Sequence, residues 1–237
     1  MTARPAARPL TLALAVLGAA VLVVLGLLLG ADLTRGATAA APEESSVDAG
    51  FARDMQVHHG QAVQMSVLVR DRSDDPDVAG LALDIMLTQQ NQQGQMAGWL
   101  STWGLRQSST LPVMGWMTTS GGPADGTGSM EGMESMEGMG TGPAPVPAGE
   151  NPMVAMGLAT SEEVDALAAA DGVAAERLYL QLMIDHHLGG VEMASVAAAE
   201  ATQPQVRRLA QAMVTGQTSE VTRLTELLDA RGGPFGT

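Results

Sequence analysis

The chain has 237 residues, with 26 acidic residues against 12 basic ones and a net charge of −14. A negative field of this size argues against nucleic acid and favours cations as partners. Cysteine is absent, which excludes disulfides, zinc–thiolate sites, iron–sulfur clusters and a cysteine nucleophile. The chain has 16 methionines but only 3 Trp, 1 Tyr and 2 Phe, so thioethers serve either as core packing or as metal ligands.

Residues 1–36 are expected to be a targeting segment. Arg4 and Arg8 precede an apolar run from Leu10 to Leu29, and about 20 apolar residues suffice for a helix to span a bilayer. The apolar core of a signal peptide is usually about 7–15 residues long, so we favour an uncleaved membrane anchor over a cleaved signal. Both interpretations place the rest of the chain outside the cytoplasm, at the cell membrane if anchored and secreted if cleaved.

The first helical hairpin is expected over residues 51–106. Helical periodicity runs from Phe51 to about Arg72, and a turn follows it. Pro76 suits the first turn of the next helix, and Gly104 is expected to end that helix.

Residues 107–159 are expected to be a flexible Met-, Gly- and Pro-rich linker, because helical periodicity is absent and turn-forming residues dominate. One part of it has methionine at every third position, which favours an open chelating tether for soft ions over incidental filler. These methionines are Met130, Met133, Met136 and Met139.

The second hairpin, expected over residues 160–232, repeats the first. A possible capping box at Thr160 begins it. The offset between the two copies is a constant 128 residues, so that Pro76 corresponds to Pro204 and Gln89 to Gln217. A single hairpin has two apolar stripes and cannot bury both, whereas two hairpins packed together can. The sequence therefore predicts an all-α fold in which the two hairpins form one four-helix bundle.

Each hairpin contains one copy of the sequence M-x-x-H-H-x-x-x-V-x-M, and the two copies contain all 4 histidines of the chain. Side chains three and four residues apart share a helix face, so the methionines and the first histidine of each copy form one stripe. The second histidine is rotated by about 100° around the helix axis from the first, so it lies on the flank of this stripe. Imidazole binds copper, zinc, iron and nickel, and thioethers select soft ions such as Cu(I). The sequence thus predicts a copper site between the hairpins, with these ligands: His58, His59, His186, His187, Met55, Met65, Met183 and Met193.

A di-iron site is disfavoured, because it needs carboxylates from four helices and Glu-x-x-His pairs. No glutamate stands three residues before a histidine in this chain. We expect an extracytoplasmic protein that sequesters Cu(I) or Cu(II) or hands it over, and that is not an enzyme. Two alternatives stay open: a metal-dependent oxidoreductase in the same bundle, and a structural or interaction module whose histidines are hydrogen-bonded core residues. The sequence also leaves open a homo-oligomer.

The two motif helices, each followed by a Pro-x-Val start and a helix with a glutamine at mid-length, resemble the family called domain of unknown function 305. The resemblance covers residues 51–104 and 174–232, and the stretch from Met183 to Met193 matches the family pattern best. It implies a ferritin-like fold and an exported bacterial protein. Some members are similar to extracytoplasmic copper-binding proteins used in copper resistance, so the resemblance also implies a copper ion as the bound metal.

Overall fold

The structure is a computed structural model that describes residues 40–117 and 151–235. Within these residues the regular structure consists of six α-helices and one short 3-10 helix, without strands, which confirms the expected all-α class. The predicted targeting segment at 1–36 and the methionine repeat at 130–139 lie outside the described residues. In the described ranges, no helix combines the length and apolar character that a membrane crossing needs.

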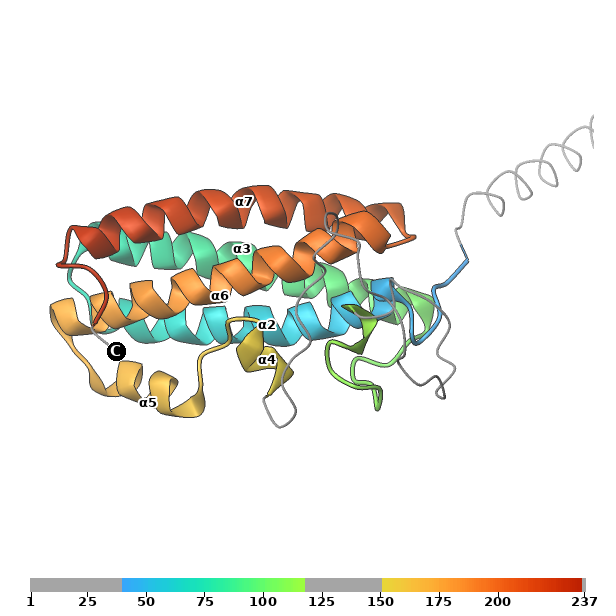
Figure 1. The fold of residues 1–237 in the computed structure, drawn as a ribbon, viewed down its shortest axis with the longest axis horizontal. Helices are drawn as coiled ribbons and strands as arrows, with labels where there is room; N and C mark the ends of the chain where they lie inside the picture. Colours follow the sequence, from blue (N-terminus) through green and yellow to red (C-terminus); the bar gives the residue numbers. More distant parts are fainter. Residues whose placement is uncertain (1–39, 118–150, 236–237) are drawn as a thin grey trace, which may run out of the picture. The chain divides into compact units, whose positions relative to one another are not determined.

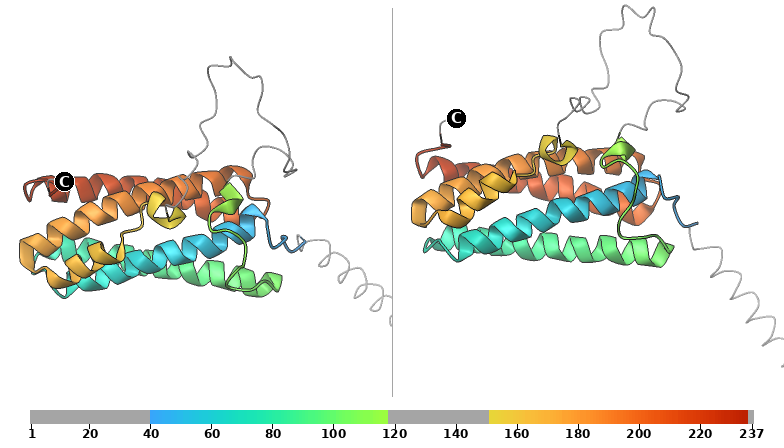
Figure 2. Two further views of the ribbon diagram at one scale, coloured as in Figure 1. Left: turned by 60° about the horizontal axis from the view of Figure 1, so that its bottom comes forward. Right: turned by 90° about the horizontal axis from the view of Figure 1, so that it is seen from below.

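Four long helices run lengthwise beside one another (Figures 1 and 2): α2 (Val47–Arg70), α3 (Pro76–Trp103), α6 (Gly172–Glu200) and α7 (Pro204–Asp229). In the first half of the chain α2 packs on α3, and in the second half α6 packs on α7. The two halves meet where α2 lies against α6. The two pairs correspond to the two hairpins that the 128-residue repeat predicts.

The helix ends follow local sequence signals. The Ser46 hydroxyl accepts a hydrogen bond from the Ala49 amide at 3.1 Å and caps α2. Pro76 opens α3, and Gly104 ends it with a left-handed φ of 72°, as predicted. The predicted capping box at Thr160, closed by Glu163, is confirmed at the start of α5 (Ser161–Ala169).

The interior contains two apolar clusters, one toward each end of the long helices. The methionine-rich cluster has eight buried methionines, namely Met55, Met96, Met114, Met117, Met153, Met156, Met193 and Met213. The leucine-rich cluster includes Tyr179, Met65 and Met183 together with six leucines. In each of the four long helices, the residues of one cluster precede those of the other, and buried polar residues stand between them.

The segment expected to be a linker is packed at both of its described ends. The 3-10 helix η1 (Gly115–Met117) places Trp116 edge-on to Phe51, with ring centroids 5.9 Å apart. Short α4 (Pro152–Ala155) brings the buried side chains of Met153 and Met156 into the methionine-rich cluster. Apolar side chains therefore anchor both described ends of this segment in the interior.

Candidate metal centre

A polar layer crosses the interior between the two apolar clusters. Each long helix contributes a pair of residues to it: His58 and His59 from α2, Gln89 and Gln92 from α3, His186 and His187 from α6, and Gln217 and Glu220 from α7. All four histidines have a relative exposure of 0%. The repeat explains this placement, since each pair recurs 128 residues later. The sequence had placed the second histidine of each doublet on the flank of its helix, and the structure buries it.

The two histidine doublets meet across the α2–α6 contact. The rings of His58 and His186 have centroids 3.8 Å apart and are tilted by 39°. The neighbouring rings of His59 and His187 lie 6.2 Å and 6.0 Å from the first ring of their own doublet. The two helices run antiparallel to each other (Figure 1).

Backbone carbonyls fix the protonation of the two central rings. The Nε2–H of His58 donates to the carbonyl oxygen of Met156 at 3.1 Å. The Nε2–H of His186 donates to the carbonyl oxygen of His58 at 2.9 Å. Because a carbonyl oxygen can only accept, Nε2 carries the proton in both rings and Nδ1 has the lone pair.

Side chains of the outer helices hold the second histidine of each doublet in the same way. His187 Nε2 lies 2.8 Å from a carboxylate oxygen of Glu220, and His59 Nε2 lies 2.7 Å from the amide oxygen of Gln92. Gln92 and Glu220 correspond under the repeat. Both oxygens accept the ring N–H, so that all four imidazoles share one tautomer.

Burial keeps the imidazoles of His58, His59 and His186 uncharged. Desolvation, followed by the charges of His59 and His187, lowers the pKa of His58 to about 3, although the hydrogen bond to Met156 opposes this shift. Desolvation also lowers the pKa of His59 to about 4 and takes the pKa of His186 well below its ordinary value. None of the four Nδ1 atoms has a hydrogen-bond partner within the described part of the chain. Buried neutral rings with a fixed Nε2–H and an unpaired Nδ1 have the protonation that a histidine metal ligand requires.

The four methionines of the motif divide into two pairs on opposite sides of the histidines. Met55 and Met193 belong to the methionine-rich cluster, and Met65 and Met183 belong to the leucine-rich cluster. Met55 and Met65 are ten residues apart on α2, which at 1.5 Å per residue separates them by about 15 Å along the helix. A single ion can therefore use one pair of thioethers, not both.

The present ring positions do not form a ready coordination shell. Among residues 40–117 and 151–235, no three histidine, aspartate or glutamate side chains are grouped so that they could hold a metal ion. The contact between His58 and His186 explains this, because stacked rings turn their faces, and not their nitrogens, toward each other. Metal binding by both hairpins therefore requires at least one of these rings to rotate.

The buried amides of Gln89 and Gln217 are members of the polar layer that sequence reasoning did not assign to the site. Their exposed fractions are 2% and 4%, and within residues 40–117 and 151–235 neither the oxygen nor the nitrogen of either amide has a partner. The sequence contained a signal for them: a glutamine interrupts the apolar stripe of each helix, at positions that are 128 residues apart.

Residues 151–160, here called the strap, lie against α6 beside the histidines. A Cβ at Gly189 would stand 1.8 Å from the Met156 carbonyl oxygen, and one at Gly157 would stand 2.1 Å from the Asp185 carbonyl oxygen. Only glycine allows this approach at either position. The approach places the Met156 carbonyl where the His58 ring can donate to it.

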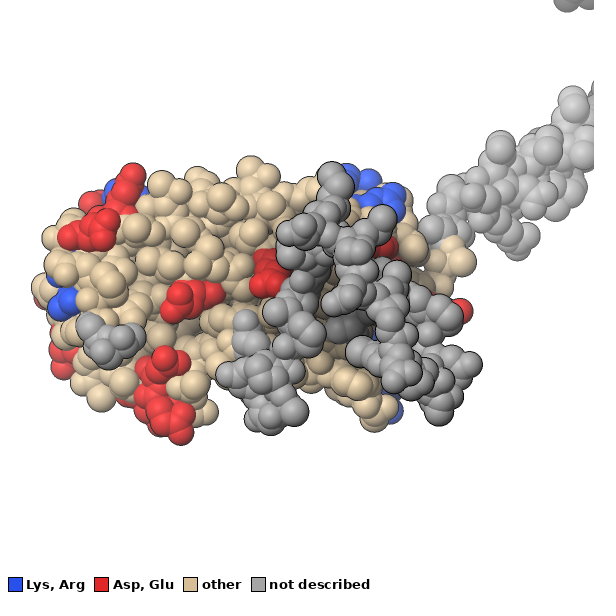
Figure 3. Space-filling view, in the orientation of Figure 1, with Lys and Arg blue, Asp and Glu red and all other residues tan. Residues whose placement is uncertain are grey.

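An acidic groove of about 440 Å³ lies between α6 and the segment formed by the strap and α5. Glu163, Asp185 and Glu192 line it, and acidic side chains gather over α5 and α6 on this face (Figure 3). Burial, and next the charge of Glu163, raise the pKa of Asp185. The groove is adjacent to the histidine-bearing stretch of α6, and its charge attracts cations.

Comparison with known proteins gives one family. The sequence profile of the family described as Domain of unknown function (DUF305) matches residues 48–228. A DUF305 protein from Streptomyces coelicolor, whose name marks it as expected to be secreted, has a solved structure that is 41% identical. The match covers 82% of this chain and 99% of that one, with a TM-score of 0.65.

Two further solved structures are more distant. A DUF305 fragment from Deinococcus radiodurans is 28% identical over 78% of this chain and 96% of that one, with a TM-score of 0.55. CopM in its Cu(I)-bound form is 20% identical over 78% and 98%, with a TM-score of 0.51, and this likeness concerns the fold alone. None of the curated proteins matches. Because the family profile spans most of the sequence, including both histidine doublets, the chain belongs to the DUF305 family.

Proposed function

We propose that this protein binds copper as cargo outside the cytoplasm, for sequestration or handover. In this proposal, residues 51–106 and 160–232 form one ferritin-like four-helix bundle and bind the ion between them. The nitrogen ligands come from both hairpins: His58, His59, His186 and His187.

The protonation of the buried imidazoles carries the proposal. Three of the four have an Nε2–H bonded to a backbone carbonyl or a carboxylate, and all four have an Nδ1 without a partner among the described residues. Burial keeps His58, His59 and His186 neutral. A histidine with a purely structural role in a core normally has partners for both nitrogens, because an unpaired buried polar atom costs about 1–3 kcal/mol. Unpaired Nδ1 atoms in one layer favour ligation.

The methionines support a soft ion. Met55 and Met193 flank the histidines on one side, and Met65 and Met183 flank them on the other. Thioethers select Cu(I), and imidazoles accept both Cu(I) and Cu(II). The acidic groove beside α6 adds a cation-attracting surface next to the histidines.

The relatives support the same proposal. CopM has been solved with Cu(I) and with Cu(II) bound, and the Streptomyces coelicolor relative is named for expected secretion. We propose that residues 1–36 act as an anchor or export signal that takes the copper-binding part to the outside of the membrane.

Competition titration with a chromogenic Cu(I) chelator tests the proposal on the full-length protein. The variant His186→Ala and the variant His58→Ala should each lose at least about tenfold in Cu(I) affinity, since each removes one ligand from the ion. Unchanged affinity in both variants, or a wild-type protein that takes up no copper, would support the structural module instead.

Matched methionine variants separate ligation from packing. Leucine preserves methionine volume at a cost below about 1.5 kcal/mol. Met55→Leu and Met193→Leu should weaken Cu(I) binding, whereas Met96→Leu and Met213→Leu should not. All four residues are buried in the same methionine-rich cluster, so an equal effect in all of them would assign the thioethers to packing.

A further inference from the structure

Among the described residues, the amides of Gln89 and Gln217 are buried without a hydrogen-bond partner, as are the Nδ1 atoms of the four histidines. Across the described part of the chain, the unpartnered buried side-chain nitrogen and oxygen atoms are the four Nδ1 atoms and the four amide atoms of these glutamines. All eight belong to the polar layer. An unpaired buried amide group costs about 1–3 kcal/mol, so both glutamines are unfavourable unless a ligand in this layer pairs with them.

Gln217 reaches the edge of a central imidazole. Its amide oxygen and the Cε1 atom of His58 lie 2.3 Å and 3.1 Å from the point where a Cβ at Gly190 would stand. Cε1 lies between Nδ1 and Nε2 in the imidazole ring, and Nε2 is bonded to the Met156 carbonyl oxygen. Nδ1 is therefore the nitrogen next to Cε1 that has an unpaired lone pair. The absence of a side chain at Gly190 provides the space in which the two groups approach each other.

The second glutamine repeats this arrangement in sequence. The 128-residue offset relates Gln217, Gly190 and His58 to Gln89, Ala62 and His186. Each half of the chain therefore supplies one buried amide, and each central imidazole has one amide as its counterpart.

The chemistry of an amide defines its partner. A glutamine side chain offers two N–H donors and a carbonyl acceptor, whereas an imidazole or thioether already bound to a metal has no group left that could pair with both. Water or hydroxide on a metal ion donates through its proton and accepts through its lone pair. An oxygen ligand of this kind satisfies both functions of an amide in a dry core.

We propose that Gln89 and Gln217 hydrogen-bond a water-derived oxygen ligand on the bound copper and thereby favour Cu(II) over Cu(I). This inference rests on the proposed copper binding and adds to it the residues that select the oxidation state. Cu(II) prefers nitrogen and oxygen ligands in a tetragonal arrangement, and Cu(I) prefers soft ligands. With Cu(I) on imidazoles and thioethers the two amides stay unpaired, whereas with hydrated Cu(II) they are paired.

Leucine variants of the full-length protein test the inference. Gln89→Leu and Gln217→Leu should each lower the Cu(II) affinity by about tenfold or more, as expected for a hydrogen bond to a charged group, and should change the Cu(I) affinity by less than about threefold. The metal-free variants should melt at the wild-type temperature or above, because an unpaired amide has been replaced by an apolar group. Gln211→Leu, an exposed position on the same helix α7, is the control and should change neither affinity.

The outcomes separate this inference from the proposed function. Equal losses for Cu(I) and Cu(II), or no loss for either, would overturn the role of the glutamines while leaving copper binding intact. A wild-type protein that binds no copper would overturn both the proposed function and the role of the glutamines.

A second measurement needs no variant. The electron paramagnetic resonance spectrum of the wild-type Cu(II) protein should broaden in water enriched in oxygen-17, because the proposed ligand exchanges with solvent and lies on the metal. A spectrum that is unchanged in enriched water would show that copper has no water-derived ligand and would end the proposal.

Discussion

Desolvation decides how His58, His59 and His186 respond to pH, and the acceptors bonded to Nε2 fix which nitrogen is left to take a proton. His58 and His186 donate to backbone carbonyls, His187 donates to the carboxylate of Glu220, and His59 donates to the amide oxygen of Gln92. Protonation of Nδ1 in His58, His59 or His186 would place a positive charge in a desolvated core. The folded protein therefore resists protonation that the unfolded chain accepts.

Acid should unfold the metal-free protein. The folded pKa values of His58 and His59 are about 3 and about 4, and an unfolded histidine has a pKa of about 6.5. Between pH 6.5 and 4 the unfolded chain binds more protons, so stability is present above pH 6.5 and falls as the pH drops below it. Each such histidine contributes about 1.4 kcal/mol per pH unit, and we expect chemical-denaturation midpoints to fall steeply between pH 6.5 and 5.

The variant His59→Gln is the control for this prediction, because glutamine is polar and does not titrate. It should reduce the slope of stability against pH by about one proton. If the wild-type protein has the same stability at pH 7 and pH 5, the imidazoles accept protons while folded, and the burial argument is wrong.

At the residue scale, the sequence identified the central pair more fully than its surroundings. The stripe through His58 and His186 followed from helical spacing and the repeat, and the structure places these two rings in contact. The acceptor from the strap and the unpaired amides of Gln89 and Gln217 did not follow, because helical spacing defines a face and not which distant backbone reaches it. The division of the motif methionines into two pairs follows from their separation along the helix. The prediction of one shared pocket did not take this separation into account.

At the scale of elements, helix ends were predictable, whereas the apolar anchors within residues 107–117 and 151–159 were not. Pro76, Gly104 and Thr160 have local signals that act within one turn. Trp116 and Met156 are anchored by distant partners, since Trp116 donates to Asp54 at 2.8 Å and the Met156 carbonyl accepts from His58. Average composition over residues 107–159 conceals single anchors of this kind.

Gly189→Ala should detach the strap from α6. The added methyl group would meet the Met156 carbonyl at 1.8 Å, and relief of such overpacking typically costs about 1–3 kcal/mol. His58 would then lose its acceptor. Hydrogen exchange should rise within residues 151–160, and the melting temperature should fall.

Gly216→Ala is the matched control for the strap. It adds the same methyl group to the middle of α7, where no described atom outside the adjoining helix backbone lies within 4 Å. The change should stabilise the protein by about 0.5–1 kcal/mol through helix propensity. Equal stability changes in the two variants would show that the strap does not bear on α6 in solution.

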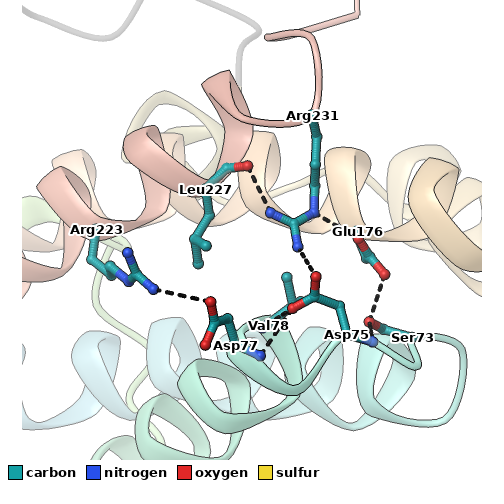
Figure 4. Close-up of polar contacts among 8 residues, drawn as sticks. All are labelled: Ser73, Asp75, Asp77, Val78, Glu176, Arg223, Leu227 and Arg231. Carbon is teal, nitrogen blue, oxygen red and sulfur yellow. Dashed lines mark hydrogen bonds and ion pairs between the residues drawn. The ribbon is translucent and has the colours of Figure 1, made fainter.

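Arg231 joins the ends of three helices (Figure 4). Its guanidinium bonds to Asp75 at the start of α3 and to Glu176 on α6 at 2.6 Å, and it donates to the Leu227 carbonyl on α7. Glu176 is 4% exposed, so Arg231→Met would leave a buried carboxylate without its cation. Urea denaturation should show a loss of about 3–5 kcal/mol.

Two further variants define the cause. Adding Glu176→Gln to Arg231→Met should recover much of the loss, because the unpaired charge is removed. Arg223→Met should cost below about 1 kcal/mol, since the Arg223 side chain is 47% exposed and lies 3.6 Å from Asp77. Similar losses of stability for Arg223→Met and Arg231→Met would show that the effect comes from removing any positive charge, and not from the buried ion pair with Glu176.

At the scale of the whole molecule, the two halves of the chain share their interior. Both apolar clusters contain residues of α2 and α3 together with residues of α6 and α7. Buried Asp48 of α2 accepts hydrogen bonds from Thr202 and Gln203 in the α6–α7 turn at 2.8–3.0 Å. The polar layer likewise needs both doublets. The repeat produces two hairpins, and their association produces the candidate site.

The halves should therefore stay together when the covalent connection is cut. Cleavage at a protease site inserted between residues 125 and 126, outside the described residues, would cut the covalent connection between the two hairpins. We expect the cleaved halves to co-elute in size-exclusion chromatography, and their unfolding midpoint to rise with protein concentration. Cu(I) should raise that midpoint further, because an ion bound by both doublets binds only the associated form. In cleaved protein with His186→Ala this copper-dependent rise should be much smaller. Halves that separate and still bind copper individually would place the ion within one hairpin and refute a centre shared between them.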